Sequence, residues 1–522
     1  FWLKPLGLSD TSHTPLQILP LLETLSMAAR SPIQVPPRLI HLHLLTATWT
    51  TCGLCLSSKF PSHLDLSAYA MNRGKRFCEE NLLMTLETCM QPFSDNTTYV
   101  VTGDIDAMWI RDSSAQLHPY VALAEREGNA SRLRPLLEGA LRSQAKFILT
   151  DPYANAFTRK WDSAKDERLA RGAYVFTGNY ELDDGPYFFR FLARIAQAFP
   201  EARVLREAPL RDAAKMLVAL YRQEQRHANG SSEYLYPKWA PWELPGNGSG
   251  APVGYTGMVW GAFRPSDDPQ TYGYNVPGNI FLAATLADVA RFAENLWGDA
   301  RLASEARQLR AEIVQGVESF GVTQRKGGER VYCYEVDGLG NCLLMDDANV
   351  PSLLSLPYLD PAAETFDQEV YRSTRRFILS RENPWYFEGS AGRGIGSPHT
   401  GADRIWPLAL VMQAMTAESQ QESDEMIRTI MRTDVFTHGL TESFHKDEAS
   451  EITRQWFGWP NALLGEYLLS RGKCSPSLQT AKFPVVRQPP RAGSLLNAPD
   501  FYSADLTRLR RPGVTLPKDE FY

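Results

Sequence analysis

The sequence predicts a protein of the all-α class, and two observations support this assignment. From about residue 65 onward, apolar residues recur at the i, i+3 and i+4 positions that share one face of a helix. Between these stripes lie long loops rich in Gly, Pro, Asp and Trp. Many paired helices joined by loops of this kind suggest a helical toroid that carries its functional groups in long loops at one end.

The helical stripes follow one another along the chain. The clearest one runs through Leu302, Ala306, Leu309, Ile313 and Val317. The other segments that we expect to be helical lie near residues 119–148, 187–199, 213–221, 282–296, 363–379, 405–416, 420–432 and 461–470. We therefore predict one large domain over residues 65–472. Residues 473–522 turn to Pro, Arg and Ser without periodicity, so we expect a poorly ordered tail outside this domain.

Residues 1–64 are expected to lie outside the helical domain. Residues 1–38 are rich in Pro and Ser, and residues 39–56 form an apolar run. With Met27 as a start, this run would be the hydrophobic centre of a signal peptide. The alternative is a buried first helix. Because His41 and His43 interrupt the run, we expect no stable membrane span.

Two further features favour the secretory pathway, meaning the extracellular space or the Golgi or ER lumen. The chain contains four Asn-x-Ser/Thr sequons, at Asn96, Asn129, Asn229 and Asn247. Ordinary composition would give about two or three by chance, so this evidence adds only a little. Cys333 and Cys342 flank a glycine-containing turn and could close a hairpin bridge in an oxidising compartment.

The composition argues against two kinds of partner. The chain has 522 residues, of which 43% are hydrophobic and 22% charged, as in an ordinary globular protein with a sizeable core. Its net charge is −6 and it has no Lys/Arg block, which argues against nucleic acid as the ligand. Cys52 and Cys55 form the one CxxC pair in the sequence; it has no second pair and no nearby set of histidine ligands, and it lies in an apolar run. We therefore predict no metal site.

Residues 102–116 carry the densest chemistry of the chain. This stretch combines three aspartates, an arginine and a tryptophan with hydroxyl and amide side chains, and it interleaves them with Ile105, Met108 and Ile110. Buried acids need partners. The wall of a sugar site meets both demands, because an aromatic face stacks on the ring while acids and amides bind its hydroxyls. The alternative is a charged helix start after a glycine turn.

Seven blocks, in this order, resemble a known family. They are TGDIDAMWIRDSSAQ at 102–116, FRPSDD at 263–268, YEVDGLGN at 334–341, DDANVPSLLSLPYL at 346–359, GIGSPHTG at 394–401, TESFH at 441–445 and TRQWFGWPNALLGE at 453–466. Over about residues 95–470 the chain thus resembles glycoside hydrolase family 125, the exo-acting α-1,6-mannosidases, which include the fungal meiotically up-regulated homologues. The resemblance implies an (α/α)6 barrel. It also implies hydrolysis with inversion and without a cofactor.

Glycoside hydrolysis needs an acid that protonates the leaving oxygen and a second carboxylate that activates water or attacks carbon. The resemblance places the acid at Asp267 or Asp268, and we prefer Asp267 while leaving the choice open. Repulsion between adjacent acids favours retention of a proton. The aspartate that is not catalytic could cap a helix. The resemblance places the base in the TESFH block, whose one carboxylate is Glu442.

The candidate mannose-binding residues come from the same blocks. By block match they are Trp109, Arg111, Asp112, Arg264 and His399. An arginine can bind vicinal hydroxyls with two N–H groups, and an aspartate can accept from two adjacent hydroxyls. His399 could equally be a core histidine. Three more aromatic residues could be either core residues or stacking platforms, namely Trp406, Trp456 and Trp459.

Two features depart from the family pattern. Residues 180–186 keep an acidic start but continue with Asp-Gly-Pro where the family has Ser-Leu-Cys, and the approach to Thr102 lacks an Asn-Thr-Leu-Asp-Thr-like run. These departures concern subsites and leave the carboxylates in place.

From the blocks and the resemblance together, we expect a monomeric exo-acting α-mannosidase that removes non-reducing terminal α-1,6-linked mannose from a glycan. The alternatives are a helical-toroid glycosidase for another sugar, such as a glucosidase, and a non-catalytic mannan-binding homologue.

Overall fold

The computed structural model describes most of the predicted domain. The described residues are 77, 79, 82, 83, 85–159, 174–230, 232, 234, 244–434, 439–472, 474, 476, 478, 479 and 481–489. Residues 1–64, with the signal-like run, therefore lie outside the described residues, and so does most of the segment 473–522.

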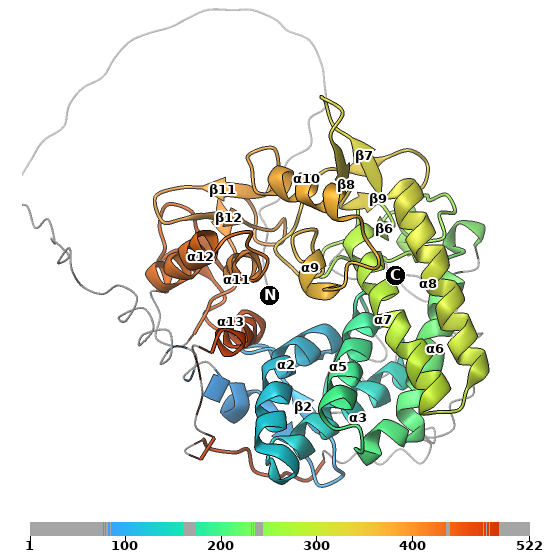
Figure 1. Cartoon of the computed structure of the whole chain (residues 1–522), viewed down its shortest axis with the longest axis vertical. Helices are drawn as coiled ribbons and strands as arrows, with labels where there is room; N and C mark the ends of the chain where they lie inside the picture. Colours follow the sequence, from blue (N-terminus) through green and yellow to red (C-terminus); the bar gives the residue numbers. More distant parts are fainter. Residues whose placement is uncertain are drawn as a thin grey trace, which may run out of the picture. The chain divides into compact units, whose positions relative to one another are not determined.

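Six of the described helices surround a common centre and form an inner ring (Figure 1). They are α2 (Ile110–Glu127), α5 (Asp184–Ala198), α7 (Val276–Asn295), α9 (Leu356–Leu359), α11 (Pro407–Met415) and α13 (Gly458–Ser470). Successive members pack side by side: α13 contacts α2, α2 contacts α5, α5 contacts α7, and α7 contacts α9. On the other side of the ring α11 contacts α13.

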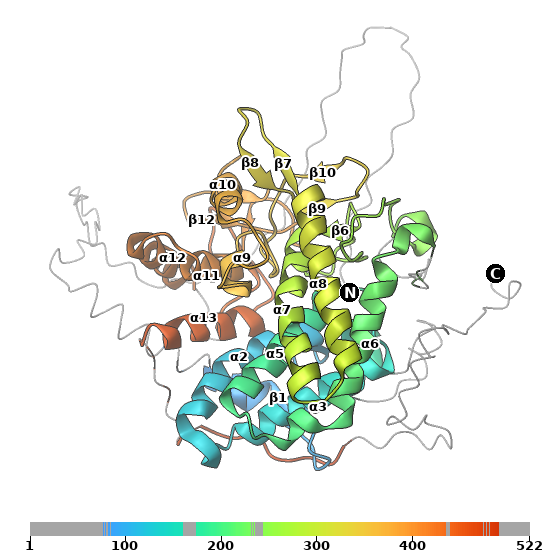
Figure 2. The same cartoon turned by 45° about the vertical axis from the view of Figure 1, so that its right-hand side comes forward.

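Outside this ring lie the amphipathic helices of the outer layer (Figures 1 and 2). They are α3 (Arg134–Thr150), α6 (Ala208–Glu224), α8 (Ala300–Phe320), α10 (Gln368–Ile378) and α12 (Gln420–Thr433). Most of them pack against the inner helix that precedes them in the chain, as α3 does on α2, α8 on α7 and α12 on α11. Short 3-10 turns are η1 (Gly128–Ala130), η2 (Arg203–Arg206), η3 (His227–Asn229) and η4 (Gly246–Gly248).

Hydrophobic pattern explains which helices are inside. The stripe predicted at 302–317 is the buried face of α8, and most of the other residues of this helix are polar or charged. In α11, by contrast, every residue from Pro407 to Ala414 is buried. A helix that is apolar around its whole circumference must be surrounded by other elements, and so α11 belongs to the inner ring. The start of α8 is capped by Asp299, whose side chain accepts from Leu302 N at 3.0 Å.

The described residues also contain six small antiparallel sheets, in the strand orders β1-β2, β3-β4-β5, β10-β9-β6, β7-β8, β11-β12 and β13-β14-β15. The strands are β1 (Met90–Pro92), β2 (Thr98–Val100), β3 (Met108–Trp109), β4 (Ala156–Phe157), β5 (Val175–Thr177), β6 (Tyr274–Asn275), β7 (Val322–Gln324), β8 (Arg330–Tyr332), β9 (Glu335–Val336), β10 (Cys342–Leu343), β11 (Tyr386–Glu388), β12 (Arg393–Ile395), β13 (Arg404–Ile405), β14 (Ser443–His445) and β15 (Ile452–Thr453). The fold is mainly helical as predicted, but the stricter all-α assignment is not confirmed.

These sheets gather loops at the starts of the inner helices. Strand β3 runs directly into α2, and β6 runs directly into α7. Met108 pairs with Phe157, and Ala156 pairs with Thr177, so three segments distant in sequence meet beside the start of α2. In the same way β13, β14 and β15 join the segments that precede α11 and α13. The loops that contain the sequence blocks are thereby brought to the N-terminal ends of the inner helices.

Part of the C-terminal segment packs against the first hairpin of the domain. Arg487 forms a bridge with Phe93, and its carbonyl accepts from Ser94 N at 2.9 Å. The guanidinium of Arg132 lies 3.6 Å from the ring centroid of Phe483. Cys474 is disulfide-bonded. Residues 481–489 thus contact the helical body, although we expected the segment 473–522 to lie outside it.

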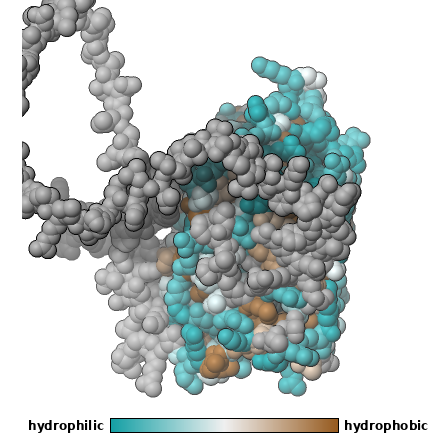
Figure 3. Space-filling view, turned by 90° about the vertical axis from the view of Figure 1, so that its left-hand side faces the viewer, coloured by the Kyte–Doolittle hydropathy of each residue, from teal (hydrophilic) through white to brown (hydrophobic). Residues whose placement is uncertain are grey.

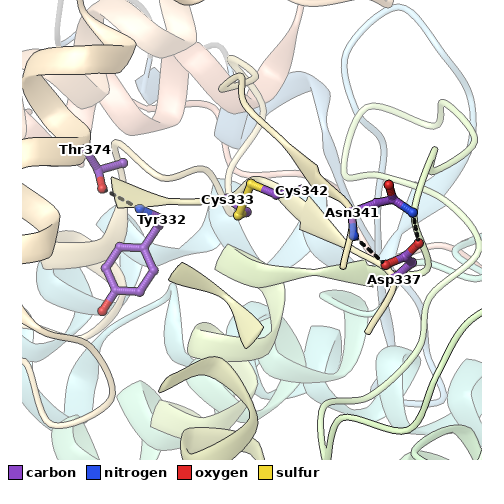
Figure 4. The surroundings of a disulfide bond; sticks show 6 residues. All are labelled: Tyr332, Cys333, Asp337, Asn341, Cys342 and Thr374. Atoms are coloured by element: carbon purple, nitrogen blue, oxygen red, sulfur yellow. Dashed lines mark hydrogen bonds between the residues drawn. A yellow bond between two sulfur atoms is a disulfide. The ribbon is translucent and has the colours of Figure 1, made fainter. Parts of the chain in front are cut away.

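Cys333 and Cys342, the pair that could close a hairpin bridge, form a disulfide (Figure 4). The bridge closes the β9–β10 hairpin, whose turn is ordered by Asp337. The carboxylate of Asp337 accepts from the backbone N–H groups of Leu339 and Asn341 and from the Asn341 side chain. At the other side of the bridge, Tyr332 N donates to Thr374 of α10 at 2.8 Å. The disulfide therefore ties this hairpin to the outer helical layer.

On the face drawn in Figure 3, the coloured residues are mainly hydrophilic, with smaller hydrophobic groups between them in the lower part of the view. Among the helices in the described part of the chain, none has both the length and the apolar character needed to cross a membrane.

Candidate active site

The candidate site lies where the inner helices begin. Trp109 ends β3, Arg111 and Asp112 stand in the first turn of α2, and Asp184 is the first residue of α5. The backbone N–H of Arg111 donates to Asp184 Oδ1 at 3.2 Å, so a carboxylate at the start of α5 binds the start of α2. Helix N-termini carry partial positive charge, which stabilises carboxylates placed there.

A tight turn presents the two adjacent aspartates of the FRPSDD block. Asp267 N donates to Arg264 O at 2.9 Å, and Arg264 N donates to Asp268 O at 2.8 Å. Asp267 has a φ of 65°, which is uncommon for a residue other than glycine. Because consecutive residues in such a turn point in different directions, the two side chains have different neighbours.

The carboxylate of Asp267 is held by three neutral N–H donors. Its Oδ1 accepts from Asn155 Nδ2 at 2.8 Å, from Trp109 Nε1 at 3.3 Å and from Asn179 Nδ2 at 3.3 Å. Its Oδ2 lies 3.9 Å from Arg111 Nη2, and 26% of the side chain is exposed. The donors therefore fix Oδ1, while Oδ2 faces the guanidinium of Arg111.

Asp268 is instead paired with the predicted residue His399. Asp268 Oδ2 lies 3.5 Å from His399 Nδ1 and accepts from Ser266 Oγ at 3.0 Å. Burial would raise the pKa of Asp268, but His399, Ser266 and Arg264 together lower it. The expectation that repulsion between the two aspartates would favour a proton is therefore wrong for Asp268. A cationic partner at contact distance outweighs a neighbouring acid.

His399 connects this pair to the predicted base. Burial opposes its charge, but the contact with Asp268 and the charges of Glu442 and Asp267 raise the pKa of His399 to about 9. Its side chain is 29% exposed, so it is not a core histidine. The imidazolium thus stands within electrostatic range of all three predicted catalytic carboxylates.

Arg111 is a buried centre for four carboxylates rather than an exposed sugar ligand. It pairs with Glu181 by a short contact, and lies 3.2 Å from Asp112, 3.7 Å from Asp183 and 3.9 Å from Asp267. Burial disfavours its charge, yet these acids, Glu181 foremost, raise the pKa of Arg111 well above its ordinary value. Its guanidinium is thus buried among carboxylates.

Arg264 also serves the scaffold. It is buried, its Nε donates to Glu335 Oε1 at 2.5 Å, and its Nη2 donates to Thr271 Oγ1 at 3.2 Å. The other oxygen of Glu335 accepts from the backbone N–H groups of Thr271 and Tyr272. This pair ties the aspartate turn to β9. The structure therefore does not present Arg264 as a direct sugar ligand, contrary to our expectation.

Glu442 precedes strand β14 and is buried. Its backbone N–H donates to the carbonyls of Thr453 and Arg454 at 3.3 Å each, which holds it against β15. Its Oε1 accepts from Arg454 Nη1 at 3.5 Å. Arg454 in turn lies within electrostatic range of Asp112, so the base segment and the first turn of α2 belong to one charged cluster.

Comparison with known proteins places this cluster in a family. Residues 72–469 match the family of metal-independent α-mannosidases, glycoside hydrolase family 125. The chain belongs to this family. It is 32% identical over 435 residues to the meiotically up-regulated gene 157 protein of Schizosaccharomyces pombe, with 77% of this chain and 84% of that protein covered.

Solved structures agree with the family 125 membership. An α-mannosidase of Streptococcus pneumoniae, in a non-productive complex with α-1,6-mannobiose, matches with a TM-score of 0.71 and 33% identity, covering 78% of this chain and 97% of that one. The glucoamylase of Saccharomycopsis fibuligera matches with a TM-score of 0.51 and 13% identity, covering 80% and 97%. At that identity the second match supports the helical fold alone.

Two tryptophans of this family 125 chain that could have been platforms are core residues. Trp406 and Trp459 are buried, and Trp406 Nε1 donates to Thr400 Oγ1 at 2.8 Å. Trp456 is half-buried.

Among the described residues there is no group of three or more His, Cys, Asp or Glu side chains that could hold a metal ion.

Sequence reasoning missed four residues that complete the cluster. They are Asn155, Asn179, Glu181 and Arg454. Glu181 and Arg454 lie inside blocks that we had recognised, so their position in those blocks was an available signal. Asn155 and Asn179 lie in loops without such a signal, and only the pairing of β3, β4 and β5 brings them to Asp267.

Proposed function

We propose that this chain is an exo-acting α-mannosidase that removes non-reducing terminal α-1,6-linked mannose with inversion of configuration. The observation that carries the proposal is the gathering of an accessible carboxyl, Asp267, and a second carboxylate, Glu442, in one buried charged cluster at the helix starts. Family 125 membership supports the substrate class. The mannobiose held by the Streptococcus pneumoniae relative supports the linkage.

Asp267 is the proposed general acid. A general acid must approach the leaving oxygen and carry a proton at the start of the reaction. Asp268 is less suited, because its ion pair with His399 lowers its pKa and favours the carboxylate. Asp267 has the more exposed side chain of the two, 26% against 12%; its Oδ1 accepts from three neutral donors, and its Oδ2 lies 3.9 Å from Arg111 Nη2, beyond hydrogen-bond distance. Its Oδ2 is therefore the atom proposed to give the proton.

Glu442 is the proposed general base. Its carboxylate would take a proton from water while that water forms a bond to the anomeric carbon. The bond from this carbon to the leaving oxygen breaks at the same time, and Asp267 protonates that oxygen. The products are β-mannose and the shortened glycan, with Asp267 left ionised and Glu442 protonated.

The remaining predicted site residues take two proposed roles. Trp109, Asp112 and His399 would contact the terminal mannose or the carboxyl groups around it, while Arg111 and Arg264 would hold the acids from behind. The assignment rests on occupancy: both guanidinium groups already bind carboxylates. His399 is partly exposed and cationic, so it can donate to a hydroxyl as well as to Asp268.

Hydrolysis of a set of mannobioses tests the proposal. The purified chain should cleave α-1,6-mannobiose at least about tenfold faster than the α-1,2 and α-1,3 isomers, and proton NMR before mutarotation should show β-mannose first. Initial α-mannose would indicate a covalent intermediate and would contradict the inverting mechanism. Cleavage of an α-glucoside instead would favour the alternative of another helical-toroid glycosidase. Binding without hydrolysis of any substrate would favour the non-catalytic alternative.

We further propose that the domain spans residues 65–472, that the protein is monomeric, and that it resides in the secretory pathway. Support for the compartment comes from the Cys333–Cys342 disulfide and from disulfide-bonded Cys474, since such bonds persist in oxidising environments. The sequon residues Asn96, Asn229 and Asn247 are exposed, as glycan carriers must be. Fractionation and removal of N-glycans would test this localisation.

A further inference from the structure

Arg454 joins two loops that lie far apart in the sequence. Its Nε and Nη2 donate to Asp104 Oδ1 at 3.0 and 2.7 Å, and its guanidinium lies 4.5 Å from the ring centroid of Phe457. The backbones of the same two loops are also joined, since Gly458 N donates to Thr102 O at 2.8 Å. Arg454 has a φ of 37°, an uncommon value for a residue other than glycine. The side chain is therefore held at both its base and its tip.

The third nitrogen of this guanidinium reaches Glu442. Arg454 Nη1 donates to Glu442 Oε1 at 3.5 Å, and the Glu442 side chain is only 7% exposed. The hydrogen bond goes to Oε1 of this carboxylate. The charged groups that face this pair are Asp104 and Asp112 on the side of Arg454 and His399 on the side of Glu442.

We propose that Arg454 is a positioning residue for the base, and that its guanidinium holds the Glu442 carboxylate in a fixed orientation. This inference rests on the proposed role of Glu442. A cation at contact distance favours the ionised form of a carboxylate, and an arginine can hold two acids in a fixed geometry where a lysine cannot. Asp104 has the more exposed side chain, 39% against 16% for Arg454, so it holds the guanidinium of Arg454 from the solvent side.

The test is the pH profile of kcat/KM on α-1,6-mannobiose for Arg454→Met and Arg454→Lys. Loss of the cation should move the acidic limb of the Met variant up by about one pH unit. We expect kcat to fall at least about tenfold while KM changes less, because the base acts after substrate is bound. The Lys variant should restore the limb toward its original position but recover only part of kcat.

Arg404→Met is the matched control. Arg404 lies in the sheet β13-β14-β15, whose strands β14 and β15 adjoin Glu442 and Arg454. It pairs with Glu451 at 2.5 Å and not with Glu442. This variant should leave the acidic limb unmoved. An equal shift in Arg404→Met would mean that any lost surface charge has this effect, and it would overturn the inference.

Two more variants keep the outcomes separate. An unshifted limb in Arg454→Met, with Glu442→Gln inactive, overturns the positioning role and leaves the base assignment standing. Full activity in Glu442→Gln overturns both. If Arg454→Met fails to fold, Arg454→Lys and Asp104→Asn decide, because Asp104→Asn keeps the cation but loses its anchor. Wild-type kcat in both of those variants overturns the inference.

Discussion

At the scale of single residues, side chains of one type take roles set by their partners. Arg111 and Arg264 are enclosed by carboxylates, and each holds part of the scaffold behind the acid turn. Arg454 spans two loops and reaches a carboxylate proposed to act in catalysis. Asp267 and Asp268 are sequence neighbours, yet Asp267 accepts from neutral N–H donors and faces Arg111 at 3.9 Å, whereas Asp268 pairs with His399. The local environment therefore separates residues that a motif treats alike.

The two aspartates should respond differently to the leaving group. A poor leaving group, such as another sugar, needs protonation more than an activated aryloxide does. Asp267→Asn should therefore slow cleavage of α-1,6-mannobiose by at least about 10²-fold and slow an activated aryl mannoside far less. Asp268→Asn should affect both substrates to a similar extent. Steady-state kinetics on the two substrates decides, and the reverse pattern would assign the acid to Asp268.

Glu442→Gln should separate binding from turnover. Glutamine keeps the size and polarity of the side chain but cannot accept a proton from water. We expect kcat on α-1,6-mannobiose to fall by at least about 10²-fold, with little change in mannose binding measured by calorimetry. Lost binding with normal turnover of bound substrate would show that Glu442 holds the ligand and does not activate water.

At the scale of elements, the site depends on how loops meet at the starts of the inner helices. Gly103 lies where the loop before β3 crosses the loop before α13, and it has a φ of 121°. A Cβ at this position would lie 2.7 Å from Trp456 O. Glycine is required here for two reasons, the backbone conformation and the close approach of another backbone.

Gly103→Ala should therefore reduce both stability and activity. Strain at such a φ alone costs about 1–3 kcal/mol, and relief of the contact with Trp456 adds to it. We expect a loss of more than about 2 kcal/mol in the free energy of unfolding, and a lower kcat because the loop also carries Asp104. Gly298→Ala is the matched control. Gly298 also has a positive φ, 63°, but has no atom within 4 Å of the added Cβ. Denaturant unfolding of both variants checks the difference, and equal losses would exclude the contact as the cause.

At the scale of the whole molecule, the cluster of buried acids makes stability depend on pH. Burial raises the pKa of Asp183 to about 6 against the charge of Arg111, and it raises the pKa of Asp346 to about 8 against three backbone N–H groups. The pKa of His399 is about 9. A pKa that is higher in the folded state gives stability that is complete below the unfolded pKa, and this stability is lost as pH rises through the folded pKa.

The free energy of unfolding should therefore decrease between about pH 6.5, the unfolded value of histidine, and pH 8. We expect the Tm at pH 6.5 to exceed that at pH 8 by at least about 2 °C, measured at one ionic strength. Among the groups that act in the opposite sense at lower pH are Asp268, whose lowered pKa matters below the usual carboxyl range, and His118, whose pKa is lowered by burial and matters below about pH 6.5. Asp346→Asn should flatten the dependence, whatever it does to the Tm itself. A Tm that rises steadily to pH 8 would contradict the prediction.

The sequence by itself determined the helical stripes and the family, and it indicated the Cys333–Cys342 bridge without fixing the pairing. Helical stripes depend on residues three and four apart, Cys333 and Cys342 are separated by nine residues, and the blocks are contiguous. Such features depend only on residues that are close in sequence. This is why the stripe from Leu302 to Val317 coincides with the buried face of α8.

Only the tertiary structure decided what the charged residues do. The contacts of Asp267 come from Trp109, Asn155 and Asn179, between 88 and 158 residues away, and Arg454 and Asp104 are 350 residues apart. The small sheets that make these contacts have strands of two or three residues, too short to leave a period in the sequence. Whether an arginine meets a sugar or a carboxylate depends on which loops these sheets bring together, and no local pattern encodes that pairing.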